Sequence, residues 1–108
     1  MRNGRYILDE QGNPVEEPEL LKWAEWFENS ANRRVALTFV ENKRISTVFL
    51  GLDHSFSNAP DAVPVLWETM VFGGEHDEYQ ERYTSKDAAL EGHWRIVEMC
   101  GGAKELTI

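Results

Sequence analysis

The fold is decided by two apolar runs at the centre of the chain, RISTVFLGL at residues 44–52 and VLWETMVFGG at residues 65–74. Both runs are rich in β-branched and aromatic residues and reach glycine at their ends, which is typical of β-strands that lead into turns. The unbroken apolar segment 48–50 predicts a strand that is covered on both faces. Each run leads into a polar segment with histidine and carboxylate side chains, so a site is expected at these strand ends.

Further strands flank the two runs. Apolar residues alternate along residues 35–40, and a tight polar connection joins this segment to residues 44–50, which predicts a β-hairpin. Shorter strands are predicted at 6–8 and at 79–83, the latter at the edge of a sheet. The long loop 51–64 has the length of a functional or mobile connection.

Two segments have helical periodicity. Residues 18–28 place Leu20, Trp23, Ala24 and Phe27 at helical spacing after a proline, which predicts an amphipathic helix. The second helix is capped by Thr84 or Ser85 and stops at Gly101-Gly102. Its apolar face is formed by Ala89, His93, Ile96, Val97 and Cys100.

Together these segments predict a single α+β domain over residues 1–102. We expect an antiparallel sheet of about four to five strands with two helices packed on it, and a C-terminal tail at 103–108. The length of 108 residues suits one domain, and a hydrophobic content of 42% with four tryptophans predicts a packed core.

Composition also indicates where the protein works. The single cysteine excludes an internal disulfide and favours a reducing compartment. No apolar stretch is long enough to cross a bilayer, and the N-terminus does not resemble a secretory signal. We therefore expect a cytoplasmic protein without a membrane partner.

The net charge of −8 argues against direct nucleic-acid binding. It indicates either a solvated acidic face that keeps the protein soluble or a protein partner with a basic surface. Carboxylates gather at residues 9–28 and 75–81. The basic residues gather at Arg33, Arg34, Lys43 and Arg44.

Histidines beside carboxylates suggest a metal site. The candidate ligands are Asp53, His54, Glu68, His76 and His93, since imidazole and carboxylate groups bind zinc, manganese and iron. No two histidines have the i, i+4 spacing of a helical metal motif. The alternative for His93 is a hydrogen-bonded core histidine, because it lies on the apolar face of the last helix.

Glu68 lies in phase with Leu66, Met70 and Phe72 on one face of its strand. A carboxylate in an apolar row is costly unless it is paired. It is therefore either a general acid or ligand, or the partner of Arg44, Arg82 or Arg95. No catalytic residue is predicted, because Cys100 lies at a helix C-terminus, where the dipole disfavours a thiolate.

The acidic segments also suggest a protein interface. Trp23 and Trp26 widen the apolar face of the first helix, and tryptophan ringed by carboxylates suits a partner with a basic rim. The residues proposed to bind a partner are Trp23, Trp26, Glu75, Asp77, Glu78 and Glu81. The alternative is that both tryptophans pack on the sheet.

The chain contains the motifs STVFLGLDH at 46–54, ETMVFGG at 68–74, and RYT at 82–84 followed by GH at 92–93. These motifs resemble those of a group of small uncharacterised proteins encoded by bacteriophages, prophages and bacteria. YILD at 6–9, GNPV at 12–15 and WAEWFE at 23–28 extend the resemblance over nearly the whole chain. The loop SNAPDAVP at 57–64 departs from the group's shorter, glycine-rich segment. The resemblance implies an accessory protein of a mobile element and transfers no catalytic residue.

The leading hypothesis is a non-enzymatic phage or prophage accessory protein without a cofactor. It would bind a host or phage protein through its acidic surface and inhibit host defence or nucleic-acid machinery. One alternative is a small metal-dependent enzyme or ligand-binding protein that uses a divalent metal. Another is a structural homodimer that pairs through an exposed strand such as 79–83.

Overall fold

A computed structural model describes residues 4–55 and 61–102. In these ranges the chain forms one compact domain with two α-helices, a short 3₁₀ helix and six strands in two antiparallel sheets. The α+β fold predicted from the sequence is confirmed. The tail predicted at 103–108 and residues 56–60 of the loop lie outside the described residues.

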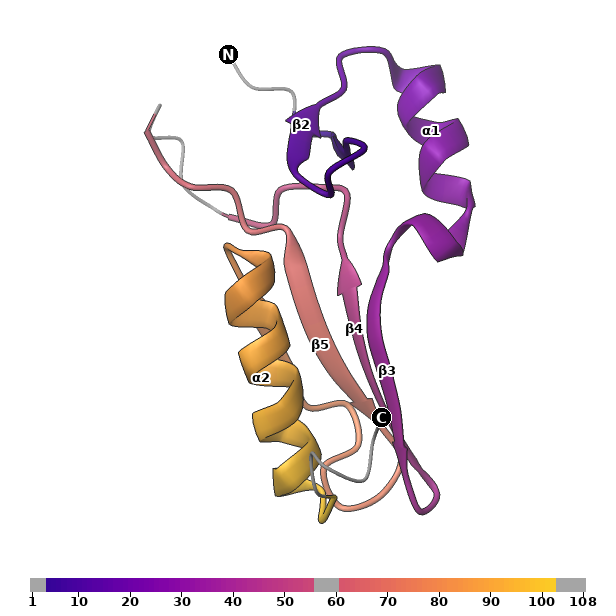
Figure 1. The fold of residues 1–108 in the computed structure, drawn as a ribbon, viewed down its shortest axis with the longest axis vertical. Helices are drawn as coiled ribbons and strands as arrows, with labels where there is room; N and C mark the ends of the chain where they lie inside the picture. Colours follow the sequence, from indigo (N-terminus) through magenta and orange to yellow (C-terminus); the bar gives the residue numbers. More distant parts are fainter. Residues whose placement is uncertain (1–3, 56–60, 103–108) are drawn as a thin grey trace.

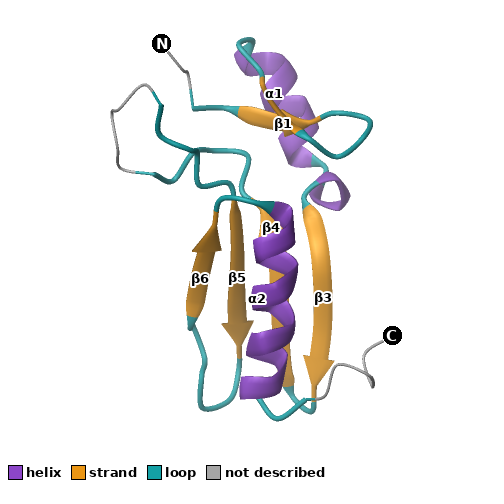
Figure 2. Ribbon diagram, turned by 60° about the vertical axis from the view of Figure 1, so that its left-hand side comes forward, coloured by secondary structure: helices purple, strands orange, loops and turns teal. Residues whose placement is uncertain are grey.

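The larger sheet is a four-stranded antiparallel meander in the order β3-β4-β5-β6 (Figure 2). Its strands are β3 (Arg34–Val40), β4 (Lys43–Phe49), β5 (Trp67–Phe72) and β6 (Gln80–Tyr83). The predicted hairpin and the predicted edge strand are both present. Ile45 lies opposite Val71 in the pairing of β4 with β5, so the two central apolar runs form the middle of this sheet.

Helix α2 (Lys86–Met99) packs across one face of the larger sheet (Figure 1). The Ser85 side chain caps it by accepting a hydrogen bond from the amide of Ala88 at 3.1 Å. One buried apolar cluster of this layer comprises Val40, Ile45, Val71, Ile96, Val97 and Cys100. Neither helix within the described residues is long and apolar enough to cross a membrane.

The N-terminal segment forms a separate layer at one end of the larger sheet. It comprises β1 (Tyr6–Leu8), β2 (Pro14–Glu16), α1 (Leu20–Glu28) and the 3₁₀ helix η1 (Ser30–Asn32). Helix α1 lies beside the β1–β2 hairpin, beyond the ends of β3 and β4 (Figure 1). Phe49 joins this layer to the sheet, because its ring meets Trp26 on one side and Trp67 on the other.

The placement of α1 leaves one face of the larger sheet without a covering element among the described residues. Along β4 the side chains alternate, so that Phe49 is fully buried against α2 while Val48 is half-buried on the other face. The prediction that residues 48–50 are covered on both faces is therefore wrong. The apolar run arises because Leu50 lies beyond the end of β4 and Val48 faces outward.

Gly92 allows α2 to approach β6 closely. A Cβ at this position would overlap the phenol ring of Tyr83, whose hydroxyl donates to Thr69 at 3.0 Å. Gly92→Ala is expected to lower the free energy of unfolding by about 1–2 kcal/mol, because overpacking outweighs the gain in helix propensity. Urea denaturation followed by circular dichroism measures this change. Glu91→Ala, on the exposed side of the same turn, is the control and should change the free energy of unfolding by no more than about 0.5 kcal/mol. Equal changes for Gly92→Ala and Glu91→Ala would contradict the prediction.

Candidate functional site

The N-terminal end of the molecule carries an acidic surface with exposed leucines. Leu21, Glu25 and Glu28 follow each other at i, i+4 and i+7 along α1, so they share one face of the helix. Leu21 is 83% exposed and Leu20 is 57% exposed. Over residues 9–28, seven carboxylates accompany a single lysine, and Lys22 forms an ion pair with Glu19 at 3.0 Å.

The two tryptophans of α1 face inward. The indole nitrogen of Trp23 donates to the carbonyl oxygen of Gly51 at 3.0 Å, and its ring stacks on Phe27 at 4.7 Å. Trp26 contacts Phe49 edge to face, with ring centroids 5.8 Å apart. Both side chains are half-buried and hold α1 to the end of the sheet. The apolar residues that α1 presents to solvent are the leucines.

The second acidic segment lies in and beside the β5–β6 turn, at the opposite end of the molecule from α1 (Figures 1 and 2). Asp77 accepts a hydrogen bond from the amide of Gly73 at 2.6 Å and so stabilises the turn. Glu75 and Glu78 are exposed. The structure therefore does not bring the acidic residues of this turn together with Trp23 and Trp26.

Glu81 differs from its acidic neighbours because its charge is compensated. The guanidinium group of Arg95 donates to both of its carboxylate oxygens, at 2.6 and 2.9 Å. This bidentate pair lowers the pKa of Glu81 to about 2. The Tyr79 hydroxyl also donates to Glu81, at 2.5 Å, and this hydrogen bond raises the pKa of Tyr79.

The candidate metal ligands are dispersed. Asp53 accepts hydrogen bonds from the amides of Ser55 and Val65, at 2.8 and 2.9 Å. The Nδ1 atom of His54 lies 2.8 Å from the carbonyl oxygen of Leu52, whereas His76 lies in the β5–β6 turn at the other end of the sheet. Across residues 4–55 and 61–102, no group of three or more His, Cys, Asp or Glu side chains could hold a metal ion.

Glu68 is the partner of Arg82. The Nε atom of Arg82 donates to Glu68 at 2.9 Å, across the pairing of β5 with β6. Of the three arginines considered from the sequence, the structure selects Arg82. Glu68 lies on the uncovered face of the sheet with Met70 and Phe72, as expected, whereas Leu66 precedes β5 and is buried.

His93 is the core histidine of the alternative interpretation. It is fully buried, with Nδ1 2.7 Å from the hydroxyl of Thr47 and Nε2 2.9 Å from the hydroxyl of Thr38. Burial lowers the pKa of His93 to about 4, so the ring is neutral at pH 7. A neutral ring donates through one nitrogen and accepts through the other, and the two hydroxyls can satisfy both roles.

The hydrogen bonds of His93 continue toward the surface. The hydroxyls of Thr47 and Thr69 are 2.5 Å apart, and the Tyr83 hydroxyl lies within hydrogen-bond distance of Thr69, at 3.0 Å, and of the Glu81 carboxylate, at 3.3 Å. Burial also raises the pKa of Tyr83. This network connects five elements, α2 and the strands β3 to β6, and satisfies the buried polar groups between α2 and the sheet.

Cys100 is buried in the layer beneath α2, and burial raises the pKa of its thiol. A thiol with a raised pKa is a poor nucleophile at neutral pH.

Several important residues were not identified from the sequence. They include the threonines around His93, which occupy inward positions of their strands, in phase with Val40, Ile45 and Val71. This alternation along the strands was the sequence signal that could have identified them as core residues. The i, i+4, i+7 series of Leu21, Glu25 and Glu28 was the corresponding signal on α1.

The chain matches no protein-family model, no curated protein and no solved structure.

Proposed function

We propose that this chain is a non-enzymatic accessory protein that binds another protein through the acidic N-terminal end. The observation that carries the proposal is the exposure of Leu20 and Leu21 on a helix whose other exposed residues are Lys22, which is paired with Glu19, and the carboxylates Glu25 and Glu28. Exposed leucines are costly in water and become favourable when a partner buries them.

The chemistry of this end describes the partner. Burial of Leu21 requires a small apolar pocket, and Glu25 and Glu28 favour lysine or arginine around it. The overall charge of −8 also accelerates encounter with a basic protein. We therefore assign the partner a basic surface with an apolar centre.

The resemblance to phage, prophage and bacterial proteins supports a mobile-element setting in the cytoplasm of a bacterial host. In that setting a basic host surface that normally holds nucleic acid is the partner chemistry we propose. Occupation of such a surface by an acidic protein would inhibit host defence or nucleic-acid machinery.

A matched pair of charge reversals tests the proposal. Capture from a bacterial lysate identifies partners, and their affinities are then measured with purified proteins. Glu25→Lys/Glu28→Lys and Glu75→Lys/Glu78→Lys change the net charge equally, by +4, because each reversal contributes +2. The α1 pair should weaken binding at least about tenfold and reduce its salt dependence, whereas the turn pair should change affinity by less than about threefold.

Leu21→Ser tests the apolar contact in the same experiment. We expect it to weaken binding about tenfold, since an interface anchor contributes more than 1 kcal/mol. Equal losses of affinity from both charge reversals would show that only net charge matters, and the proposal would be wrong.

Native mass spectrometry of the untagged protein separates the alternatives, because a stoichiometric metal would favour the metal site and a stable dimer would favour the structural subunit.

A further inference from the structure

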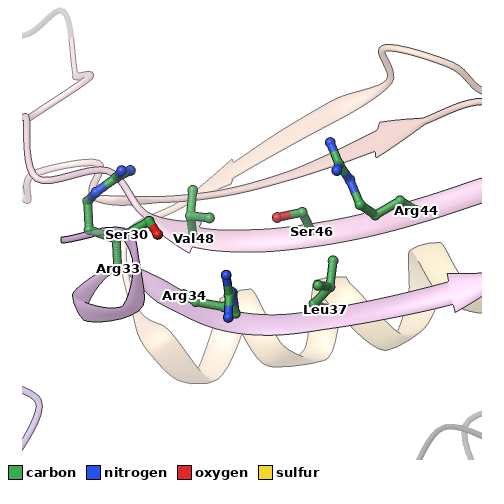
Figure 3. A pocket seen from close by; sticks show the side chains of 7 residues that line it. All are labelled: Ser30, Arg33, Arg34, Leu37, Arg44, Ser46 and Val48. Atoms are coloured by element: carbon green, nitrogen blue, oxygen red, sulfur yellow. The ribbon is translucent and has the colours of Figure 1, made fainter. Parts of the chain in front are cut away.

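The uncovered face of the larger sheet contains a pocket of about 250 Å³ between η1, β3 and β4. Its walls include Leu37 from β3 and Val48 from β4, and the hydroxyl groups of Ser30 and Ser46 also line it (Figure 3). The pocket therefore combines a small apolar surface with hydroxyl groups that can donate hydrogen bonds.

Three arginines complete the lining. Arg33 and Arg44 lie toward the two ends of the pocket, with Arg34 between them (Figure 3). Arg34 pairs with Val48 across the strands, four residues from Arg44 along β4, so the two arginines begin about 13 Å apart along the strand direction. Arg33 and Arg44 can therefore approach a ligand from the two ends of the pocket, and Arg34 can approach it from between them.

Two of the guanidinium groups are held in place. The Nε atom of Arg33 donates to the carbonyl oxygen of Phe27 at 3.0 Å, and its guanidinium lies over the Phe27 ring at 4.1 Å. The guanidinium of Arg44 lies 4.2 Å from the centroid of Phe72. Stacking on a ring fixes a guanidinium while most of its N–H groups stay free, so the donors are partly ordered before a ligand arrives.

The charges of these arginines are not compensated within the described part of the chain. None of Arg33, Arg34 and Arg44 forms an ion pair there, whereas Arg82 pairs with Glu68 and Arg95 pairs with Glu81. Three uncompensated guanidinium groups around one small pocket favour an anionic ligand.

We propose that this pocket binds a small phosphorylated anion through its phosphoryl oxygen atoms. Guanidinium groups match phosphoryl oxygens in bidentate geometry, and serine hydroxyls add further donors. The volume is below the range of pockets for drug-sized ligands, which suits a phosphoryl group and a compact body against Leu37 and Val48. A longer polyanion is disfavoured, because the net charge of −8 repels it.

Titration with defined anions tests the pocket. Two-dimensional ¹H–¹⁵N NMR, including the arginine Nε resonances, is recorded at about 0.15 M NaCl, where nonspecific surface attraction is screened. The titrants are inorganic phosphate, pyrophosphate, ADP and, for comparison, a short single-stranded oligonucleotide. We expect saturable shifts at Arg33, Arg34, Arg44 and Ser46, with a Kd below about 1 mM for pyrophosphate or ADP. Tighter binding of ADP would identify a nucleotide source, and equal binding would identify the phosphoryl groups alone.

Single charge removals supply the control. Arg34→Gln and Arg44→Gln should each weaken binding by about tenfold or more, since each removes hydrogen bonds to a charged group. Lys86→Gln, an exposed residue at the start of α2, removes the same charge elsewhere and should leave binding unchanged. The proposal is overturned if shifts do not saturate, if Lys86→Gln is equally harmful, or if only a single-stranded oligonucleotide produces the shifts.

Discussion

Phe49→Ala is expected to lower the free energy of unfolding by about 3–5 kcal/mol, the range typical of a large aromatic residue removed from a core. Phe49 is fully buried at the end of β4, where the N-terminal layer meets the larger sheet. Its ring centroid lies 5.8 Å from that of Trp26 and 5.4 Å from that of Trp67. Alanine would leave a cavity between the two layers and remove both aromatic contacts.

Chemical denaturation followed by both tryptophan fluorescence and circular dichroism measures this effect. Phe39→Ala is a suitable control, because Phe39 belongs to the same sheet but is 66% exposed on the uncovered face. Phe39→Ala should lower the free energy of unfolding by less than about 1 kcal/mol. Similar losses for Phe39→Ala and Phe49→Ala would contradict the assignment of Phe49 as the residue that joins the layers.

Acidification is expected to destabilise the protein through His93. The pKa of His93 is lowered from 6.5 to about 4 by burial, so below pH 6.5 the unfolded chain binds a proton that the folded protein does not. The stabilisation that neutral His93 contributes is fully present above pH 6.5 and is lost as the pH falls toward 4. Linkage gives a loss of about 2 kcal/mol between pH 7 and pH 5, and of about 3 kcal/mol by pH 4.

Denaturation curves at several pH values between 7 and 5 isolate this group. The interval avoids Glu81, whose pKa is lowered from 4.5 to about 2; its contribution is lost only as the pH falls from 4.5 toward 2. His93→Gln should remove the slope, although Thr38 and Thr47 lose part of their hydrogen bonding and the protein is less stable overall. His54→Gln should retain the slope. A wild-type protein with constant stability from pH 7 to 5 would rule out a buried neutral His93.

The strands and helices were predictable because their signals are local. Alternation in residues 35–40, the apolar runs and the cap at Ser85 all report on neighbours within a few positions. Local signals of this kind do not determine where α1 packs. Its apolar face could pack on a sheet face or at a sheet end, and in the observed position the lack of a side chain at Gly51 leaves room for the Phe27 ring.

The predicted site residues show the same division. That His93 is a core residue followed from the periodicity of its helix, but Thr38 and Thr47 come from two other strands, and only the sheet register brings them to its ring. The partner of Glu68 was limited to three arginines, and the pairing of β5 with β6 selected Arg82.

The α+β class, the acidic character and the inward phase of His93 are predictable from the amino-acid sequence, because composition belongs to the chain itself and periodicity reports on residues a few positions apart. The order of the main strands and helices is predictable in the same way, although β2 and η1 were not predicted. Tertiary packing places the two acidic segments at opposite ends and turns Trp23 and Trp26 inward. It also brings Arg33, Arg34 and Arg44 to one uncovered pocket, because side chains far apart in the chain meet only after strand register and layer packing are set.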